Sequence, residues 1–220
     1  MGISSRVPIL LLKEGSTETK DKNAQRNNIT AAKLVTQMVK SSLGPRGMDK
    51  MLVDTLDDVT VTNDGATILK EIDVEHPAAK MMVEITKSVD NEVGDGTTSV
   101  VVLAGLLLEK AEELINKNVH PTVIVDGYRK SAEKAIELLK QNSEKIDPPT
   151  NKDYLEKIAS TSMSSKLTAN NSTELSQLVV NAILSIFENR NSNENIEKFK
   201  VDIDNVKVEK KQVVQSEIQN

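Results

Sequence analysis

One segment dominates the sequence: Gly94-Asp95-Gly96-Thr97-Thr98-Ser99-Val100-Val101-Val102-Leu103-Ala104-Gly105-Leu106-Leu107-Leu108. It opens with a glycine-rich loop and continues as a run that is apolar on nearly every side of a helix up to Leu108. From there to Asn118 the pattern becomes amphipathic. A helix of this kind is expected to have its first half in the centre of a protein. We therefore predict that residues 97–118 form the central helix of a domain.

Other segments carry apolar residues at spacings of three and four, which predicts amphipathic helices. These helices are expected within residues 31–43, 66–71, 77–93, 121–141, 154–159 and 175–186. Two short runs, Met51-Leu52-Val53 and Val59-Thr60-Val61-Thr62, flank an acidic connection and predict a small hairpin. A short apolar run at 7–12 and alternating patterns at 201–204 and 206–208 predict further strands. The fold class is therefore mostly α with a small β component.

The composition excludes several classes of function. The 220 residues carry 28 basic and 33 acidic side chains, for a net charge of −5, and this balance does not suit a nucleic-acid partner. Aromatic residues make up only 2% of the chain, so the core must be aliphatic. With no cysteine, the chain has no disulfide, no Cys-ligated zinc and no thiol nucleophile. His76 and His120 each precede a proline, which is typical of turns rather than of metal ligands.

The longest apolar run, 100–108, is much shorter than the about 20 residues that cross a bilayer. We therefore expect no membrane partner and a cytoplasmic protein.

The loop before the central helix could hold a phosphorylated ligand. Flexible glycines at a helix start let several N–H groups point at one anion, and the helix dipole favours negative charge there. Asp95 can reach a hard cation such as Mg²⁺. Hydroxyl groups follow it at Thr97, Thr98 and Ser99. The alternative is an ordinary loop with a capping Thr or Asp.

Two more loops allow a similar interpretation. Leu43-Gly44-Pro45 follows a predicted helix, and its glycine would let a nucleotide approach the backbone closely; a simple helix stop is the alternative. In Asn63-Asp64-Gly65, the carboxylate could bind metal or orient water, or it could be a plain helix cap. No Walker A lysine motif occurs in the sequence, so any phosphate site differs from that of the P-loop enzymes.

These loops, in this order and spacing, resemble those of one family. The motifs are Leu43-Gly44-Pro45-Arg46-Gly47-Met48-Asp49-Lys50-Met51, Val61-Thr62-Asn63-Asp64-Gly65-Ala66-Thr67-Ile68, Glu75-His76-Pro77-Ala78-Ala79-Lys80-Met81 and Gly94-Asp95-Gly96-Thr97-Thr98. Together they resemble the group II chaperonins of the thermosome type. The resemblance is strong over about residues 23–140 and looser to about residue 210.

The resemblance implies a subunit with equatorial, intermediate and apical domains. Residues 1–149 would be the first half of the helical equatorial ATP-binding domain, and 150–220 the outgoing arm of an α+β intermediate domain. The apical domain and the returning half would be absent. The family's activity implies ATP-driven folding of unfolded client proteins in a double ring with other chaperonin subunits.

The resemblance also implies roles for individual residues. Leu43, Gly44 and Pro45 would line ATP or ADP, with Asn63 and Gly65 near the nucleotide. Asp95 would hold Mg²⁺. Asp64 would be catalytic, helping the attacking water near the terminal phosphate. The phosphate contacts would come from Gly94, Gly96, Thr97, Thr98 and Ser99. Ser165 and Lys166 resemble the loop that senses the terminal phosphate, although the family commonly has glycine where Ser165 stands.

The missing returning half leaves a second function open. The family's second nucleotide loop and its later catalytic aspartate would lie there, and phosphoryl transfer needs metal, water and phosphate clamps held together. A truncated fragment that binds nucleotide weakly, or acts only in assembly and interaction, is therefore the alternative to a hydrolysing subunit.

Overall fold

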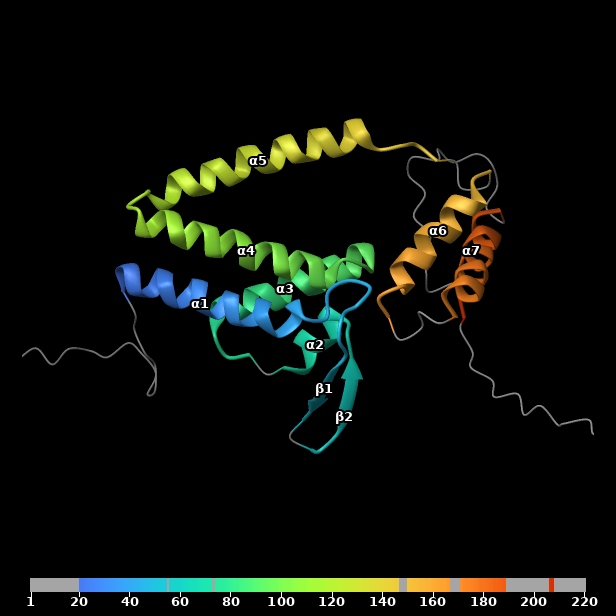
Figure 1. Cartoon of the computed structure of the whole chain (residues 1–220), viewed down its shortest axis with the longest axis horizontal. Coiled ribbons are helices and arrows are strands. Elements are labelled where there is room, and N and C mark those ends of the chain that lie inside the picture. Colours follow the sequence, from blue (N-terminus) through green and yellow to red (C-terminus); the bar gives the residue numbers. More distant parts are fainter. Residues whose placement is uncertain are drawn as a thin grey trace, which may run out of the picture. The chain divides into compact units, whose positions relative to one another are not determined.

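The computed structural model describes residues 20–54, 56–72, 74–146, 150–166, 171–188 and 206–207. These residues form mainly helices with one small hairpin (Figure 1). The elements are α1 (Asp21–Lys40), β1 (Lys50–Val53), β2 (Val59–Thr62), α2 (Gly65–Glu71), α3 (Pro77–Val93), α4 (Thr97–Asn116), α5 (Pro121–Asn142), α6 (Lys152–Met163) and α7 (Ser172–Glu188). The predicted fold class, mostly α with a small β component, is confirmed.

The chain divides into two compact units. The first contains residues 1–41 and 65–129, and the second contains residues 42–64 and 130–220. The described part of the first unit holds α1 to α4 without the hairpin, together with the start of α5. The second holds the hairpin, the end of α5, and α6 and α7. The domain boundary predicted after residue 149 stays a prediction.

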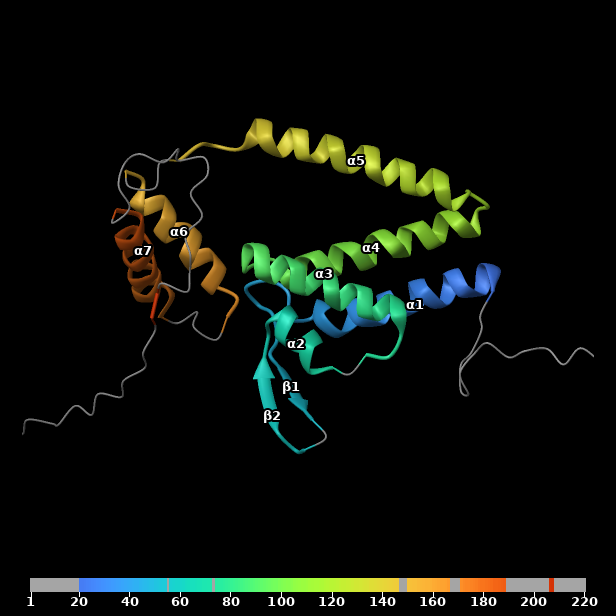
Figure 2. The same ribbon diagram turned by 180° about the vertical axis from the view of Figure 1, so that it is seen from behind.

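The first unit is built around α4. Helix α1 packs along it, α3 packs against both α1 and α4, and α2 packs against α3. Figure 2 shows α3 alongside α4 from behind. The core between them is aliphatic, as the composition predicted, and its largest fully buried apolar side chains are Ile68, Leu69, Val39 and Val101.

A glycine sets how closely α1 and α4 approach. A Cβ on Gly105 would lie 1.9 Å from Thr36 Oγ1, so only glycine fits at this point of α4. The Thr36 hydroxyl donates to the carbonyl of Ala32 at 2.9 Å and lies 3.3 Å from that of Val101. The crossing therefore depends on a small residue in one helix facing a hydroxyl in the other.

Helix α4 confirms the predicted helix, but its first half is not buried on every side as the sequence predicted. Val101 and Val102 are buried, at 0% and 7% exposure. Leu103 is 58% exposed, and Leu106 and Leu107 are each 40% exposed. Among the described residues, α1 and α3 therefore cover one side of the helix and leave the other side to solvent.

In the second unit, β1 and β2 form an antiparallel pair in the register Lys50↔Thr62 to Val53↔Val59. This confirms the predicted hairpin. Helices α6 and α7 pack against each other (Figure 1). They extend beyond the predicted bounds of 154–159 and 175–186, because the polar residues at their ends carry no apolar periodicity.

Other predictions lie wholly or partly outside the described residues. The strands predicted at 7–12 and 201–204 fall there, and Val206 and Lys207 are described but belong to neither helix nor strand. Helix α1 begins at Asp21, ten residues before the apolar pattern predicted, because its first turns are polar and exposed. Within the described part of the chain, no helix is long and apolar enough to cross a membrane.

Candidate functional site

The turn between α3 and α4 depends on two left-handed glycines. Gly94, with φ of 74°, caps α3, and its N–H donates to the carbonyl of Asp90 at 2.9 Å. Gly96, with φ of 81°, is the N-cap of α4. Other residues rarely adopt such φ values. The two glycines therefore let α3 end and α4 begin within three residues, with Asp95 between them.

The N-terminus of α4 is polar and only partly accessible. Its N-cap is Gly96, which has no side chain to bind the first N–H groups of the helix. Asp95 is exposed, and its Oδ1 accepts a hydrogen bond from the N–H of Gly96 at 2.7 Å. Thr97 and Thr98 are buried, whereas Ser99 is exposed. In this structure Ser99 is the accessible hydroxyl of the three.

The first turn of α2 lies directly against the first turn of α4. A Cβ on Gly65 would lie 2.6 Å from Thr98 Oγ1 and 2.9 Å from the backbone N and Cα of Thr98. Glycine is therefore required at this position by packing. Two residues predicted from separate loops, Gly65 and Thr98, are in close contact, and Asp64 directly precedes Gly65 in the chain.

Two polar contacts join Asn63 and Asp64 to the loop that follows α6. Lys166 Nζ lies 2.6 Å from Asp64 Oδ1, with 36% and 27% of the two side chains exposed. The amide of Asn63 donates to the carbonyl of Ser165. The sequence predicted both Asp64 and Lys166 near a terminal phosphate, and the structure brings them together across 102 residues of chain. The backbone contact to Ser165 was not predicted, because no local pattern signals a bond over this separation.

The 42–47 loop is a tight turn. Gly44 has φ of 87°, and the N–H of Gly47 donates to its carbonyl at 2.9 Å. A Cβ on Gly47 would lie 2.2 Å from the Ser42 carbonyl oxygen, so the turn has no room for a side chain there. Leu43 and Pro45 are both exposed on this turn. Helix α1 ends at Lys40, before the turn begins.

The described residues contain no group of three or more His, Asp or Glu side chains that could hold a metal by themselves. A Mg²⁺ ion does not need one, because it keeps several waters and commonly binds one or two carboxylates plus substrate phosphates. A single exposed carboxylate at Asp95, beside a helix N-terminus, fits this pattern.

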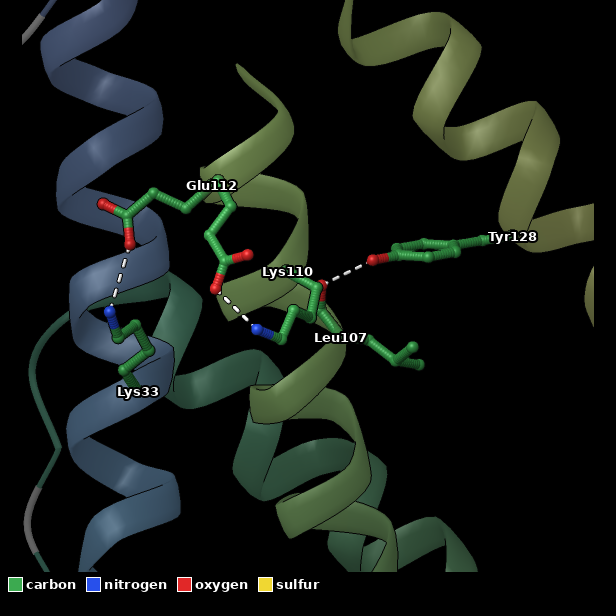
Figure 3. Close-up of polar contacts among 6 residues, drawn as sticks. Lys33, Leu107, Lys110, Glu112 and Tyr128 are labelled. Atoms are coloured by element: carbon green, nitrogen blue, oxygen red, sulfur yellow. Dashed lines mark hydrogen bonds and ion pairs between the residues drawn. The ribbon is translucent and has the colours of Figure 1, made fainter. Parts of the chain in front are cut away.

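A separate set of polar contacts lies away from these loops, around α4 (Figure 3). Lys33 on α1 lies 3.1 Å from Glu112, which ties α1 to α4. The carboxylate of Glu113 accepts a hydrogen bond from Lys110 at 2.6 Å, and this bond raises the pKa of Lys110 and lowers that of Glu113. The Tyr128 hydroxyl donates to the carbonyl of Leu107 at 2.7 Å, joining α5 to α4. These contacts fix the helices and contribute no group to the loops.

Comparison with known proteins gives the family. Residues 35–220 match the TCP-1/cpn60 chaperonin family. The chain is 53% identical to thermosome subunit alpha of Sulfolobus acidocaldarius over 212 residues, which cover 93% of this chain and 37% of that protein. It is 53% identical to thermosome subunit alpha and 51% identical to thermosome subunit beta of Archaeoglobus fulgidus, in each case covering 93% of this chain and 36% of the relative.

The chain thus spans little more than a third of the length of the curated relatives it matches. The match nevertheless includes all the loops described above. The sequence identity is also well above the level at which family membership is in question. This chain belongs to the TCP-1/cpn60 chaperonin family.

Proposed function

We propose that this chain is the front portion of an ATP-dependent chaperonin subunit, which binds Mg-ATP and assists the folding of unfolded proteins in a double ring. The observation that carries the proposal is the α3–α4 turn. Two left-handed glycines place the exposed Asp95 at the N-terminus of α4. A helix N-terminus of this kind is suited to phosphate, and a carboxylate beside it is suited to the Mg²⁺ that accompanies a nucleotide.

In this proposal the phosphates contact the backbone of Gly94 and Gly96 and the Ser99 hydroxyl, and Asp95 holds Mg²⁺. Thr97 and Thr98 are buried and shape the helix start, so their backbone N–H groups supply the contacts. Leu43, Gly44 and Pro45 line the nucleotide. The close approach of Gly65 to Thr98 supports a shared role for Gly65 and the α4 start.

Asp64 and Lys166 form the reactive part of the proposed site. Asp64 orients the attacking water as a hydrogen-bond acceptor, and Lys166 provides a positive charge for the terminal phosphate. The 2.6 Å ion pair between them supports this proposal, because it shows that the two side chains reach one another. The Asn63–Ser165 bond holds the two loops that carry them.

The proposed partners follow from the relatives. Their names describe alpha and beta subunits, which supports an oligomer of chaperonin subunits around this chain. Unfolded clients would be bound by the complete subunit, in the cytoplasm. ATP hydrolysis is proposed for that complete subunit rather than for these 220 residues alone.

A second candidate function is an assembly or interaction module that binds nucleotide weakly or not at all. It is favoured by one observation, the coverage of only 36–37% of each relative. Phosphoryl transfer requires several groups held together, and the loss of one lowers the rate by orders of magnitude.

Calorimetric titration with ATP, with and without Mg²⁺, together with size-exclusion chromatography separates the two. Ring-sized particles that release heat only when Mg²⁺ is present support the chaperonin subunit. A monomer that gives no heat with ATP contradicts it and supports the assembly module.

A further inference from the structure

The side chain of Asn63 is buried and already bonded, although the family resemblance implies a place near a nucleotide. Asn63 is 9% exposed, and its amide donates a hydrogen bond to the main-chain carbonyl of Ser165. The next residue, Asp64, reaches Lys166 and keeps 27% of its side chain exposed. A buried amide with an acceptor in the protein is typical of a contact that holds structure. Asp64 is therefore the more accessible of the two neighbours.

The two contacts fix different parts of the segment that carries Lys166. Asp64 holds the end of the Lys166 side chain at 2.6 Å, whereas Asn63 holds the backbone one residue earlier, at Ser165. A lysine side chain has a long flexible stem, so an ion pair at its end leaves the backbone free to move. A bond to the preceding carbonyl restricts that movement. The place of the Lys166 ammonium therefore depends on Asn63 as well as on Asp64.

Both segments are anchored by local structure. Thr62 ends β2, and its hydroxyl accepts a hydrogen bond from the N–H of Asp64 at 3.1 Å. The N–H of Lys166 donates to the carbonyl of Met163, the last residue of α6, at 3.0 Å. A contact between these two short turns therefore acts on Lys166 without a long flexible segment in between.

The two contacts also differ in strength. The Asp64–Lys166 pair is partly exposed, and water and salt weaken exposed ion pairs. Asn63 is buried, and removing one partner of a buried hydrogen bond leaves the other partner unpaired. We therefore expect the bond from Asn63 to hold the segment more firmly than the ion pair does.

The contact is compatible with the serine that stands where the family commonly has glycine. Asn63 bonds the main chain of Ser165, so the bond does not depend on the side chain at that position. Among the described non-glycine residues, positive φ occurs only at Asp57 and Asn118. Ser165 thus has a backbone conformation that serine adopts without strain.

We propose that Asn63 is a positioning residue for Lys166 and not a ligand of the nucleotide. It holds the carbonyl of Ser165, and this places the Lys166 ammonium where it meets a terminal phosphate. This role rests on the proposed function, which puts Lys166 beside that phosphate. Asn63 then acts on ATP, which has the terminal phosphate, and leaves the binding of ADP unchanged.

Kinetics of a chaperonin assembly that contains this chain test the role. Asn63→Ala lowers kcat for ATP hydrolysis about three- to tenfold, because a displaced charge stabilises the reacting phosphate less well. The affinity for Mg-ADP stays unchanged, which also shows that the variant folds. Asn27→Ala is the matched control, because Asn27 is an exposed asparagine on α1, and it changes neither quantity.

A double variant shows whether Asn63 acts through Lys166. Lys166→Met removes the ammonium and lowers kcat at least as much as Asn63→Ala does. Adding Asn63→Ala to Lys166→Met lowers kcat no further, because the group that Asn63 positions is already absent. A purely structural role, or a direct contact of Asn63 with the nucleotide, would instead multiply the two losses.

Amine labelling without nucleotide tests the placement itself. Lys166 is acetylated several-fold faster in Asn63→Ala than in the original chain, because its segment opens more often. Lys152 on α6 is the internal control, since it is 46% exposed and pairs with Glu156 rather than with these residues. Its rate is the same in both chains, as mass spectrometry of the labelled peptides would show.

Three results overturn the inference: losses in kcat that multiply in the double variant, a fall in Mg-ADP affinity in Asn63→Ala, and an unchanged labelling rate of Lys166. The proposed function fails separately, since labelling uses no nucleotide. Faster labelling of Lys166 without any Mg-ATP binding defeats the proposed function alone. ATP hydrolysis with multiplied losses defeats this inference alone.

Discussion

Gly65 offers the sharpest test of how the α2 and α4 helix starts pack. In Gly65→Ala the new Cβ would lie 2.6 Å from Thr98 Oγ1 and 2.9 Å from the N and Cα of the same residue. Two of these three atoms belong to the backbone of a buried turn, so rotating a side chain does not remove the overlap. Inserting a group into a packed core typically costs about 1–3 kcal/mol. We expect Gly65→Ala to lower the free energy of unfolding by this amount.

Gly127 is the matched control. It lies inside helix α5, and a Cβ there would meet no atom within 4 Å. Alanine in a helix interior is more favourable than glycine by about 0.5–1 kcal/mol. Gly127→Ala is therefore expected to raise the free energy of unfolding, whereas Gly65→Ala is expected to lower it.

Urea unfolding followed by circular dichroism measures both variants. The midpoint falls for Gly65→Ala and rises for Gly127→Ala, with little change in the slope against denaturant. A Gly65→Ala midpoint equal to or above that of the original chain would refute the close approach of α2 to α4. An equal fall of the midpoint in both variants would also refute it, because the loss of stability would then be unrelated to the contact with Thr98.

Three further predictions follow from individual residues. Gly96→Val strains a backbone with φ of +81°. We therefore expect weaker Mg²⁺-dependent nucleotide binding in any assembly that contains this variant. A crystal structure of the variant with nucleotide bound undisturbed at this turn would count against the site. A double-mutant cycle of Asp64→Asn and Lys166→Met gives a coupling of about 0.5–1 kcal/mol that shrinks in 1 M salt, because the pair is partly exposed; zero coupling at low salt contradicts the ion pair. Glu113→Gln lowers the melting temperature slightly at pH 7. The difference in melting temperature between this variant and the original chain disappears as the pH falls through the lowered pKa of Glu113 or rises through the raised pKa of Lys110. A difference that grows on acidification contradicts the hydrogen bond between Lys110 and Glu113.

Much of the fold was predictable because its signals are local. Pro77 at the first position of α3 and Gly94 at its end mark that helix within the sequence itself. The hairpin was readable from the apolar residues 51–53 and the alternating Val and Thr of 59–62 on either side of an acidic turn. The α3–α4 turn was readable from glycines at both sides of Asp95, and both glycines adopt positive φ.

The remaining features depend on contacts between distant residues. Nothing near Gly65 in the sequence indicates that Thr98 lies against it, and nothing near Asn63 indicates a bond to Ser165. The exposure of Leu103 also escapes prediction, since an all-round apolar helix indicates burial but not which neighbours supply it.

At the candidate site, the family resemblance related residues that local sequence patterns do not relate. Asp64 and Lys166 are 102 residues apart, and no periodicity or spacing relates them. Only the family pattern predicted that both lie near one phosphate. The ion pair between them agrees with that expectation, and their chemical roles stay a proposal.

Mg²⁺-dependent nucleotide binding by an Asp95→Ala variant, in an assembly containing this chain, tests the central proposal most directly. Asp126→Ala is the control, because Asp126 is an exposed aspartate on α5 whose partner is Arg129 and which lies outside the loops. Titration calorimetry should show Mg²⁺-dependent ATP binding lost in Asp95→Ala and kept in Asp126→Ala. Equal ATP affinity in the original chain and in Asp95→Ala would contradict the assignment of Asp95 as the metal ligand.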